Sequence, residues 1–298
     1  MQLPSHELAA FAAAARLRSF SAAALAVHIT QPALTQRIQS LERALATTLF
    51  IRDRKGVRLT EAGERLLRYC QVKEDLEQEL LADLGRGSAG ALGGTLRLAG
   101  YSTVLHPVLV PAIAPLLRAN PDIRFDMASR EMGDLPGLLL RGEADLVVLD
   151  RTFERADVES LPLGHESYVL IESAAHATAD VYLDHDPADR TTERFLKLQG
   201  RGRRPFRRAY MDDIDGILRG VALGLGRGVV PRHLLAARSG VRVVADLQPL
   251  EIPVVLHRRR QPYHSRLQQA VVDALVAASG EFLSARPRPR RLGARPSS

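Results

Sequence analysis

A polar helix face between residues 31 and 45 carries side chains that can read the edges of DNA bases. The apolar residues of this segment recur at helical spacing on one side: Leu34, Ile38, Leu41 and Leu45. The residues turned away from them, at about 100° per residue, are Thr35, Gln36, Gln39 and Arg43. Glutamine can pair with adenine, threonine can touch a thymine methyl group, and arginine can reach guanine or phosphate. The pattern favours a recognition helix in the major groove, and an ordinary solvated helix face is the alternative.

Neighbouring elements must hold this helix against DNA. The sequence predicts helices over residues 5–16, with Ser5 as N-cap, and 21–28, with Ser21 as N-cap and Leu25 buried. Thr30 is expected to cap the third helix, with Pro32 in its first turn. The segment LFIRDRKGVRLTEAG then predicts a basic hairpin that turns at Gly56 and lies along the DNA backbone or minor groove. The expected DNA-contacting residues are Ser21, Thr30, Gln31, Pro32, Thr35, Gln36, Gln39, Arg43, Arg52, Arg54 and Lys55.

Charge supports a polyanionic partner. The 298-residue chain has a net charge of +7, and residues 1–60 contain eight arginine and lysine residues against three acids. No run approaches the roughly 18 apolar residues of a membrane span, and the start MQLPSHELAAF lacks the features of a secretory signal, so we expect a cytoplasmic protein. The single cysteine, Cys70, is expected to be a packing residue, with a redox sensor as the alternative.

The first 65 or so residues resemble the winged helix-turn-helix domain of LysR-type transcriptional regulators. The resemblance rests on SFSAAALAVHITQPALTQRIQSLE and LFIRDRKGVRLTEAGERLL. It implies double-stranded DNA with an inverted-repeat operator as the partner, together with a homodimer that assembles into a tetramer, and contact with RNA polymerase. This chain has Thr35 and Gln36 where family members commonly have serine and often a basic residue, so the base preference does not carry over.

A long helix is predicted from Glu61 to about Leu84, capped by Thr60. Its apolar residues recur at spacings of three, four or seven, namely Leu66, Tyr69, Leu76, Leu80 and Leu84. By resemblance to the family's linker helix we expect dimerisation through this side, and packing on the chain's own effector domain is the alternative. The five glycines of residues 85–94 predict a hinge.

From Gly94 onward, strands and helices alternate, and the near-continuous apolar strands predict a parallel sheet with crossover helices. The segment LPLGHESYVLI crosses into a second unit, and the final helix SRLQQAVVDALVAA is expected to return to the first. RGEADLVV and GLGRGVVPRHLL resemble the two-lobed, periplasmic-binding-protein-like effector domain of the same regulators. That resemblance implies a ligand between the lobes.

The cleft of such a sheet lies beyond the carboxyl ends of its strands. The first strand leads into Tyr101, Ser102 and Thr103 at a helix N-terminus, where free N–H groups and hydroxyls suit an anion. Ser102 and Thr103 could equally cap the helix. We expect a small, acidic effector, and its candidate contacts are Tyr101, Ser102, Thr103, Ser129, Arg130 and Asp150.

Other motifs favour structural roles. Asp184, His185 and Asp186 have metal-ligand side chains, but residues in a strand alternate faces, and Asp186 before Pro187 indicates a helix N-cap, so no metal is expected. Gly224 is interpreted as a helix C-cap. The arginines between 201 and 208 indicate a solvated loop, with an anion site as the alternative, and the tail SARPRPRRLGARPSS is expected to be disordered.

The sequence thus predicts an α/β protein with an N-terminal all-α winged helix-turn-helix domain (1–60), a linker helix and hinge (61–90), a two-lobed effector domain (91–284) and a basic tail (285–298). Lobe I comprises residues 91–162 and 264–284, and lobe II residues 163–263. No catalytic constellation is evident, so we expect a regulator without cofactor or membrane partner. The alternatives are a two-lobed small-molecule binding protein or enzyme, and a nonspecific architectural DNA-binding protein.

Overall fold

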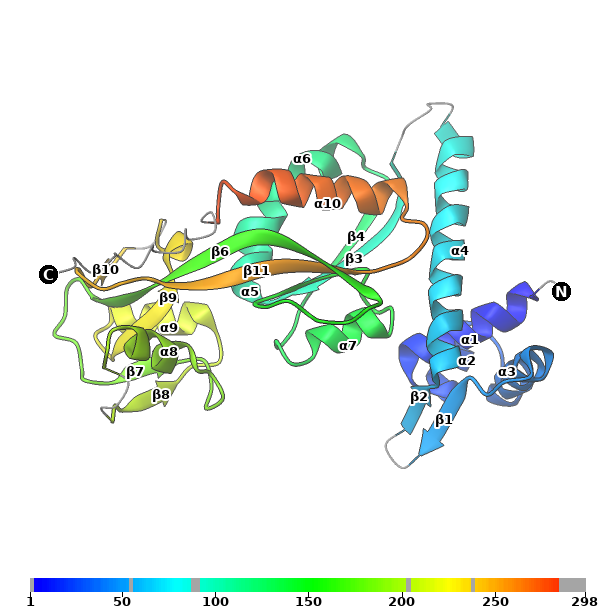
Figure 1. Cartoon of the computed structure of the whole chain (residues 1–298), viewed down its shortest axis with the longest axis horizontal. Helices are drawn as coiled ribbons and strands as arrows, with labels where there is room; N and C mark the ends of the chain where they lie inside the picture. The colour runs from blue at the N-terminus through cyan, green and yellow to red at the C-terminus, as the bar shows by residue number, and fades with distance from the viewer. Residues whose placement is uncertain (1–2, 54–55, 87–91, 202–204, 237–238, 284–298) are drawn as a thin grey trace, which may run out of the picture.

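A computed structural model describes residues 3–53, 56–86, 92–201, 205–236 and 239–283. The N-terminal unit contains helices α1 (Ser5–Leu17), α2 (Phe20–Ala26) and α3 (Gln31–Leu45), followed by the antiparallel strands β1 (Phe50–Asp53) and β2 (Gly56–Leu59). Phe11, Phe20 and Phe50 pack ring against ring in its core, with centroids 5.3 Å apart in both contacts. The predicted three helices and hairpin are confirmed (Figure 1), but Gly56 is the first residue of β2 and pairs with Asp53 rather than forming the turn.

Two predicted N-caps were wrong. Pro4 rather than Ser5 precedes α1, and Ser19 rather than Ser21 caps α2 by accepting a hydrogen bond from the Ala22 N–H at 3.2 Å. With that earlier start, Phe20, Ala23 and Ala24 face the core, and Leu25 is 77% exposed instead of buried. The α3 cap is as predicted, since the Thr30 hydroxyl accepts a hydrogen bond from the Ala33 N–H at 3.3 Å.

Helix α4 (Glu61–Arg86) connects the N-terminal unit to the rest of the chain. Thr60 caps it, because its Oγ1 accepts a hydrogen bond from the Gly63 N–H at 3.0 Å. A Cβ at Gly63 would lie only 2.3 Å from the Leu49 carbonyl oxygen, so the helix can start this close to the hairpin only with glycine there. Of the predicted hinge, residues 87–91 lie outside the described part of the chain.

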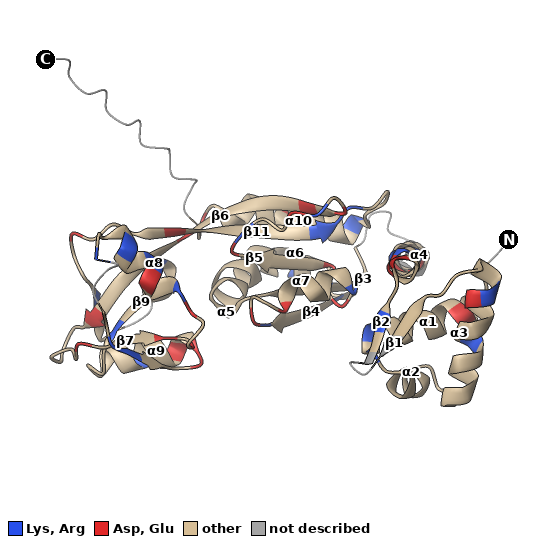
Figure 2. Cartoon of the chain, turned by 60° about the horizontal axis from the view of Figure 1, so that its bottom comes forward, with Lys and Arg blue, Asp and Glu red and all other residues tan. Residues whose placement is uncertain are grey.

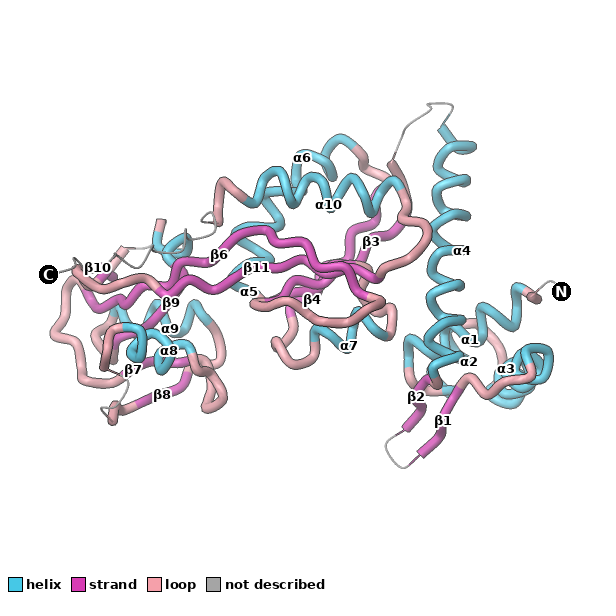
Figure 3. Tube along the Cα trace, in the orientation of Figure 1, coloured by secondary structure: helices cyan, strands magenta, loops and turns pink. Residues whose placement is uncertain are grey.

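The C-terminal half of α4 packs on the edge of the effector domain, which was the alternative to dimerisation (Figure 3). The Gln78 side-chain oxygen accepts a hydrogen bond from the Thr95 N–H at 2.8 Å, and Glu79 contacts both Tyr263 and Arg266. Leu76, Leu80 and Leu84 stay exposed on α4. One helix therefore contacts its own effector domain and still has an apolar side without a described partner.

The strands of the effector domain form one sheet across both lobes. In lobe I these are β3 (Gly94–Gly100), β4 (Ile123–Ser129) and β5 (Leu146–Leu149); in lobe II they are β7 (Tyr182–Asp184), β8 (Arg208–Tyr210), β9 (Arg227–Pro231) and β10 (Val241–Val243). Two long strands, β6 (Val158–Ser173) and β11 (Leu250–Arg259), connect the lobes. The order is β4-β3-β5-β11-β6-β9-β7-β8, with β10 paired to β6.

The sheet is mixed rather than parallel throughout. The pairs β3–β4, β3–β5, β7–β8 and β7–β9 are parallel, as predicted for each lobe. The crossing strands β6 and β11 run antiparallel to one another, and β11–β5 and β6–β9 are antiparallel as well. The two-lobed expectation is confirmed, but the parallel expectation fails at the crossing because the chain enters and leaves lobe II side by side.

Helices cover the sheet. Lobe I has α5 (Ser102–Val104), a π-helical turn (Leu105–Leu109), α6 (Val110–Ala119), α7 (Leu135–Leu140) and α10 (Arg266–Ser279), which returns to lobe I as predicted. Lobe II has α8 (Thr191–Leu198), α9 (Ile214–Ala222) and the short helix η2 (Arg232–Leu235). The helical run Ser102–Ala119 has the length and composition of a membrane span, contrary to the expectation that no run approaches one. Its Leu105, Leu109 and Ile113 are buried in the lobe I core with α10.

Candidate functional site

The outer face of α3 presents the predicted amides. Gln36, Gln39 and Arg43 are exposed, Thr35 is half-buried, and Leu34, Ile38 and Leu41 are buried beneath them. At the start of the helix, the Ser21 hydroxyl donates to the Gln31 side-chain oxygen at 2.8 Å, which connects α2 to α3. This face can form bidentate hydrogen bonds to base edges in a groove wide enough for a helix.

The hairpin beside α3 adds positive charge. Arg58 of β2 is exposed, and Figure 2 shows basic residues on the N-terminal unit. Arg54 and Lys55 lie outside the described residues, and of Arg52 only the backbone, paired with Val57, is described. The strand pairing places the Arg52 backbone next to the last described pair of the hairpin, Asp53 with Gly56.

A second polar cluster lies where the lobes meet. Tyr101 and Thr103 come from lobe I, Glu166 and Tyr168 from the crossing strand β6, and His233 from η2 of lobe II. His233 Nε2 lies 2.9 Å from the Thr103 carbonyl oxygen and 3.8 Å from Glu166 Oε1. Tyr168 donates a hydrogen bond to Glu166 Oε2 at 3.3 Å. We call these five residues the interlobe cluster.

Burial controls the protonation of the interlobe cluster. Glu166 is 0% exposed, and this loss of solvation raises its pKa to about 7, although the hydroxyls of Thr103, Tyr101 and Tyr168 oppose the increase. Burial is the larger cause and the negative charge of Glu166 the second cause that raise the pKa of Tyr101 and of Tyr168 well above the ordinary value. Burial also lowers the pKa of His233. Near neutral pH the cluster therefore contains one carboxyl group close to its titration point among neutral neighbours.

Three buried atoms of the interlobe cluster lack a fully formed hydrogen bond among the described residues. They are the Tyr101 hydroxyl, Thr103 Oγ1 and Glu166 Oε1. Buried polar atoms of this kind are costly unless another group satisfies them. A ligand with a hydrogen-bond donor, and above all a cation, would satisfy the Glu166 oxygen and the hydroxyls together.

The predicted effector contacts separate into groups. Tyr101 and Thr103 belong to the interlobe cluster, and the charge of Asp150 acts on Tyr101 and Glu166. Ser102 and Thr103 both line a cavity of about 810 Å³ together with His106, Asp213 and Arg219. Ser129 and Arg130 are exposed, and Arg130 donates to the Ser129 carbonyl oxygen at 2.7 Å.

Glu166, Tyr168 and His233 were not among the site residues predicted from the sequence. Glu166 and Tyr168 stand two apart in a strand, so they share a face, and their polarity inside an apolar segment was a usable signal. His233 offered none, because only the fold brings η2 against Thr103.

Lobe II contains the motifs first interpreted as structural. Asp184 is buried against Thr192 and Arg208, so Arg208 is part of an internal ion pair, whereas Arg201 and Arg207 are exposed. Asp186 is not the N-cap of α8, which starts at Thr191; it accepts hydrogen bonds from the Ala188 and Asp189 N–H groups in a turn. Gly224 ends α9 with a φ of 78°, as predicted. Arg203, Arg204 and the tail lie outside the described residues.

Cys70 is a buried free thiol in the core of the N-terminal unit, where burial raises its pKa to about 11. A protonated thiol reacts slowly with oxidants, which agrees with the predicted packing role.

Comparison with known proteins identifies both parts of the chain. Residues 5–64 match the family described as "Bacterial regulatory helix-turn-helix protein, lysR family", and residues 89–280 match the "LysR substrate binding domain". The HTH-type transcriptional regulator TrpI of Pseudomonas aeruginosa is 30% identical over 297 residues, which cover 92% of this chain and 98% of that protein.

Solved structures share the fold. ArgP from Mycobacterium tuberculosis has a TM-score of 0.75 at 24% identity, covering 96% of this chain and 100% of that chain. LysG from Corynebacterium glutamicum with bound effector Arg has a TM-score of 0.71 at 23% identity, covering 94% and 99%. With the exposed amide face of α3 and a polar cluster between two lobes, these matches show that the chain belongs to the LysR family of bacterial transcriptional regulators.

Proposed function

We propose that this LysR-family regulator binds an inverted-repeat DNA operator as a homodimer, which pairs into a tetramer, and that a small effector between its lobes controls it. The exposed side chains of α3 carry the DNA proposal, since Gln36 and Gln39 sit on the face opposite the buried stripe. The DNA-binding domain in this proposal comprises residues 1–60, and the effector domain comprises residues 91–284. Arg52, Arg54 and Lys55 are proposed to contact phosphate.

For the effector we propose a zwitterion of the amino-acid class. The sequence favoured an acidic effector, and a carboxylate still suits the helix N-terminus at Ser102 and Thr103. The helix N-terminus favours a negative group, whereas the buried acceptor Glu166 Oε1 favours a positive one. An ammonium group would satisfy this oxygen. The Corynebacterium glutamicum relative, whose structure contains bound Arg, supports this class.

In this proposal the chain acts in the cytoplasm as a binding protein and not as an enzyme. Effector binding favours one arrangement of the lobes, which alters the shape of the oligomer on DNA and access of RNA polymerase.

The deciding experiment is selection of binding sequences from a random duplex library. The affinity for the most enriched duplex is then measured over a range of salt concentrations. An enriched inverted repeat, spaced by whole helical turns, is expected because a two-fold dimer contacts two half-sites. Failure to enrich any sequence, with affinity that merely collapses in salt, would favour a nonspecific architectural protein.

The effector proposal is tested separately by thermal unfolding with each common amino acid. A ligand that binds the native state raises the melting temperature with its concentration. If no amino acid shifts the wild type, the proposed effector class is wrong, whatever the DNA experiment shows.

A further inference from the structure

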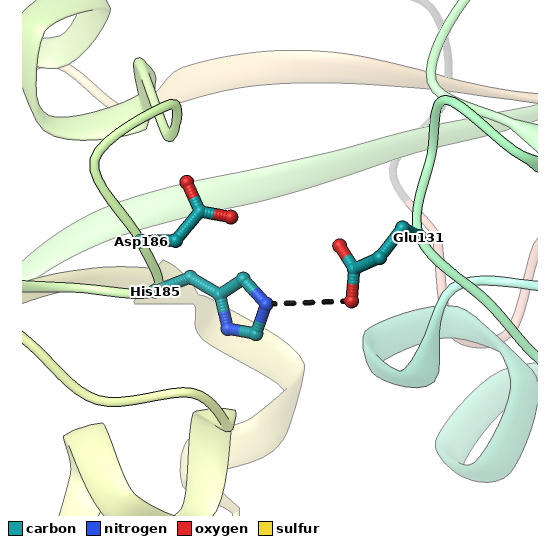
Figure 4. Close-up of side chains that lie close together, drawn as sticks. All are labelled: Glu131, His185 and Asp186. Carbon is teal, nitrogen blue, oxygen red and sulfur yellow. Dashed lines mark ion pairs between the residues drawn. The ribbon is translucent and has the colours of Figure 1, made fainter.

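We propose that Glu131, His185 and Asp186 form a site for a divalent transition metal that bridges the two lobes. Glu131 follows β4 in lobe I, and His185 and Asp186 follow β7 in lobe II. Their potential ligand atoms all lie within 4.8 Å of one another. His185 Nε2 lies 3.6 Å from Glu131 Oε1, and Figure 4 shows the two side chains extending toward each other from facing segments.

The spacing fits a metal after small side-chain movements. Ligand atoms at about 2.0–2.2 Å from a tetrahedral zinc ion lie roughly 3.4 Å apart. The Glu131 side chain is 71% exposed, so it can rotate onto an ion without repacking a core. Three protein ligands leave a fourth position for water or for a donor atom of a bound effector.

Hydrogen bonds already orient the Asp186 carboxylate and hold the backbone around it. Asp186 Oδ1 accepts from the Ala188 N–H at 2.6 Å and the Asp189 N–H at 2.8 Å, which leaves its other oxygen for an ion. The backbone N–H of His185 donates to Asp189 Oδ2 at 3.2 Å, which holds the backbone at His185 against the same turn. The bonds to Asp186 are of the kind that fix the direction of a carboxylate ligand in metal sites. Asp184, which precedes His185, points instead into the lobe II interior toward Arg208 and is no ligand.

The donor set selects the kind of metal. One imidazole with two carboxylates suits zinc and its first-row neighbours better than calcium or magnesium, which prefer oxygen donors alone. Two carboxylate charges balance the dication. Because the ligands come from both lobes, the ion would stabilise the arrangement in which the lobes approach each other.

The test is calorimetric titration of the full-length, chelator-treated protein with zinc chloride at pH 7.5. The wild type is expected to bind zinc, and His185→Ala and Glu131→Gln are each expected to weaken it at least about 10-fold. Cobalt(II) absorption should show the same order of affinities. His176→Ala is the matched control, since His176 is an exposed histidine of the same lobe.

Each other outcome overturns part or all of the proposal. Equal zinc affinity in His185→Ala and wild type would exclude the site. Weakening by His185→Ala but not by Glu131→Gln would place the ion on lobe II alone and exclude the bridge. As a second readout, zinc at a fixed concentration should raise the melting temperature of wild type and of His176→Ala by similar amounts and that of Glu131→Gln by less.

Discussion

At the residue scale, the chain places a few polar side chains where apolar ones would be cheaper. Glu166 is the clearest case, because a fully buried carboxyl group without a complete set of partners costs free energy in the unliganded protein. A cost of this kind is regained when a ligand satisfies the group, so the interlobe cluster is built for a bound state.

Glu166→Gln should remove a pH-dependent loss of stability. The folded-state pKa of about 7 lies above the ordinary value of 4.5, so the native state binds more protons than the unfolded chain between these values. Stability therefore falls as pH rises from about 4.5 through 7, by an amount on the order of 3 kcal/mol. The glutamine variant has no carboxyl group at this position and so lacks this pH dependence. In urea unfolding between pH 5 and 8, the free energy of unfolding of the variant relative to wild type should increase with pH up to about pH 7.

The other titratable groups facing Glu166 do not produce that curve, because Tyr101 and Tyr168 have raised pKa values and the pKa of His233 is lowered. Parallel pH dependences of the two proteins would contradict the assignment. In the wild type, the affinity for an ammonium-bearing effector should rise as pH increases through 7, since only the ionised carboxylate attracts the cation. In Glu166→Gln this rise should be absent.

Gln36→Ala should relax base preference, since it removes paired hydrogen bonds to a base edge and leaves phosphate contacts intact. The expected loss is about 1–3 kcal/mol on the selected operator and little on unrelated DNA. Fluorescence anisotropy with both duplexes measures it. Arg52→Ala provides the contrast, because loss of a phosphate contact should weaken both duplexes about equally. An equal loss on both duplexes for Gln36→Ala would show that this amide reads no base.

At the element scale, the fate of each predicted helix and strand shows what local sequence decides. The stripe of α3, the β1–β2 hairpin and the cap of α4 were predictable because periodicity, glycine and threonine act locally. The start of α2 was not, because Ser19 and Ser21 are equally good caps and the burial of Phe20 in the finished core decides between them. The interlobe cluster was out of reach, since its members meet only through β6 and η2.

Helix α4 illustrates how one element can serve two surfaces. Its polar residues Gln78 and Glu79 bind the effector domain of the same chain. Leu76, Leu80 and Leu84 point elsewhere and are 46%, 57% and 73% exposed. An apolar stripe of this extent on a helix is normally covered by a partner.

Leu80→Asp should therefore dissociate the dimer, because a charge would have to be buried in the helix-to-helix contact. Sedimentation velocity at micromolar concentration should show a shift toward monomer, with at least a 10-fold weaker dimer. Leu223→Asp is the control, since Leu223 is 65% exposed in lobe II, away from α4. A dimer unchanged by Leu80→Asp would mean that the chain associates through another surface.

At the scale of the whole molecule, charge is arranged for long-range attraction to DNA. The sequence pI is about 10.0, and residues 285–298 alone contribute five arginines without an acid. The tail lies outside the described residues, and its charge alone predicts an attraction to DNA.

Removal of residues 285–298 should lower the salt dependence of DNA binding. Each phosphate contact contributes about 0.9 to the slope of log affinity against log salt concentration, so loss of five arginines should lower the slope by up to about 4.5. Anisotropy titrations over a range of salt concentrations measure it on the selected operator and on unrelated DNA. An unchanged slope would show that the tail does not reach DNA, and a loss confined to the operator would indicate a sequence-specific role instead.

The position of β11 between β5 and β6 has a consequence for the order in which this protein folds. Lobe I is interrupted by all of lobe II, and its sheet and core are completed only by β11 and α10, the last described elements of the chain. During synthesis the N-terminal unit can fold first. The apolar surface of lobe I then stays uncovered for on the order of ten seconds, until the final segments leave the ribosome. A DNA-binding unit thus exists before the sensor that governs it, and a nascent chain truncated before β11 would carry the first without the second.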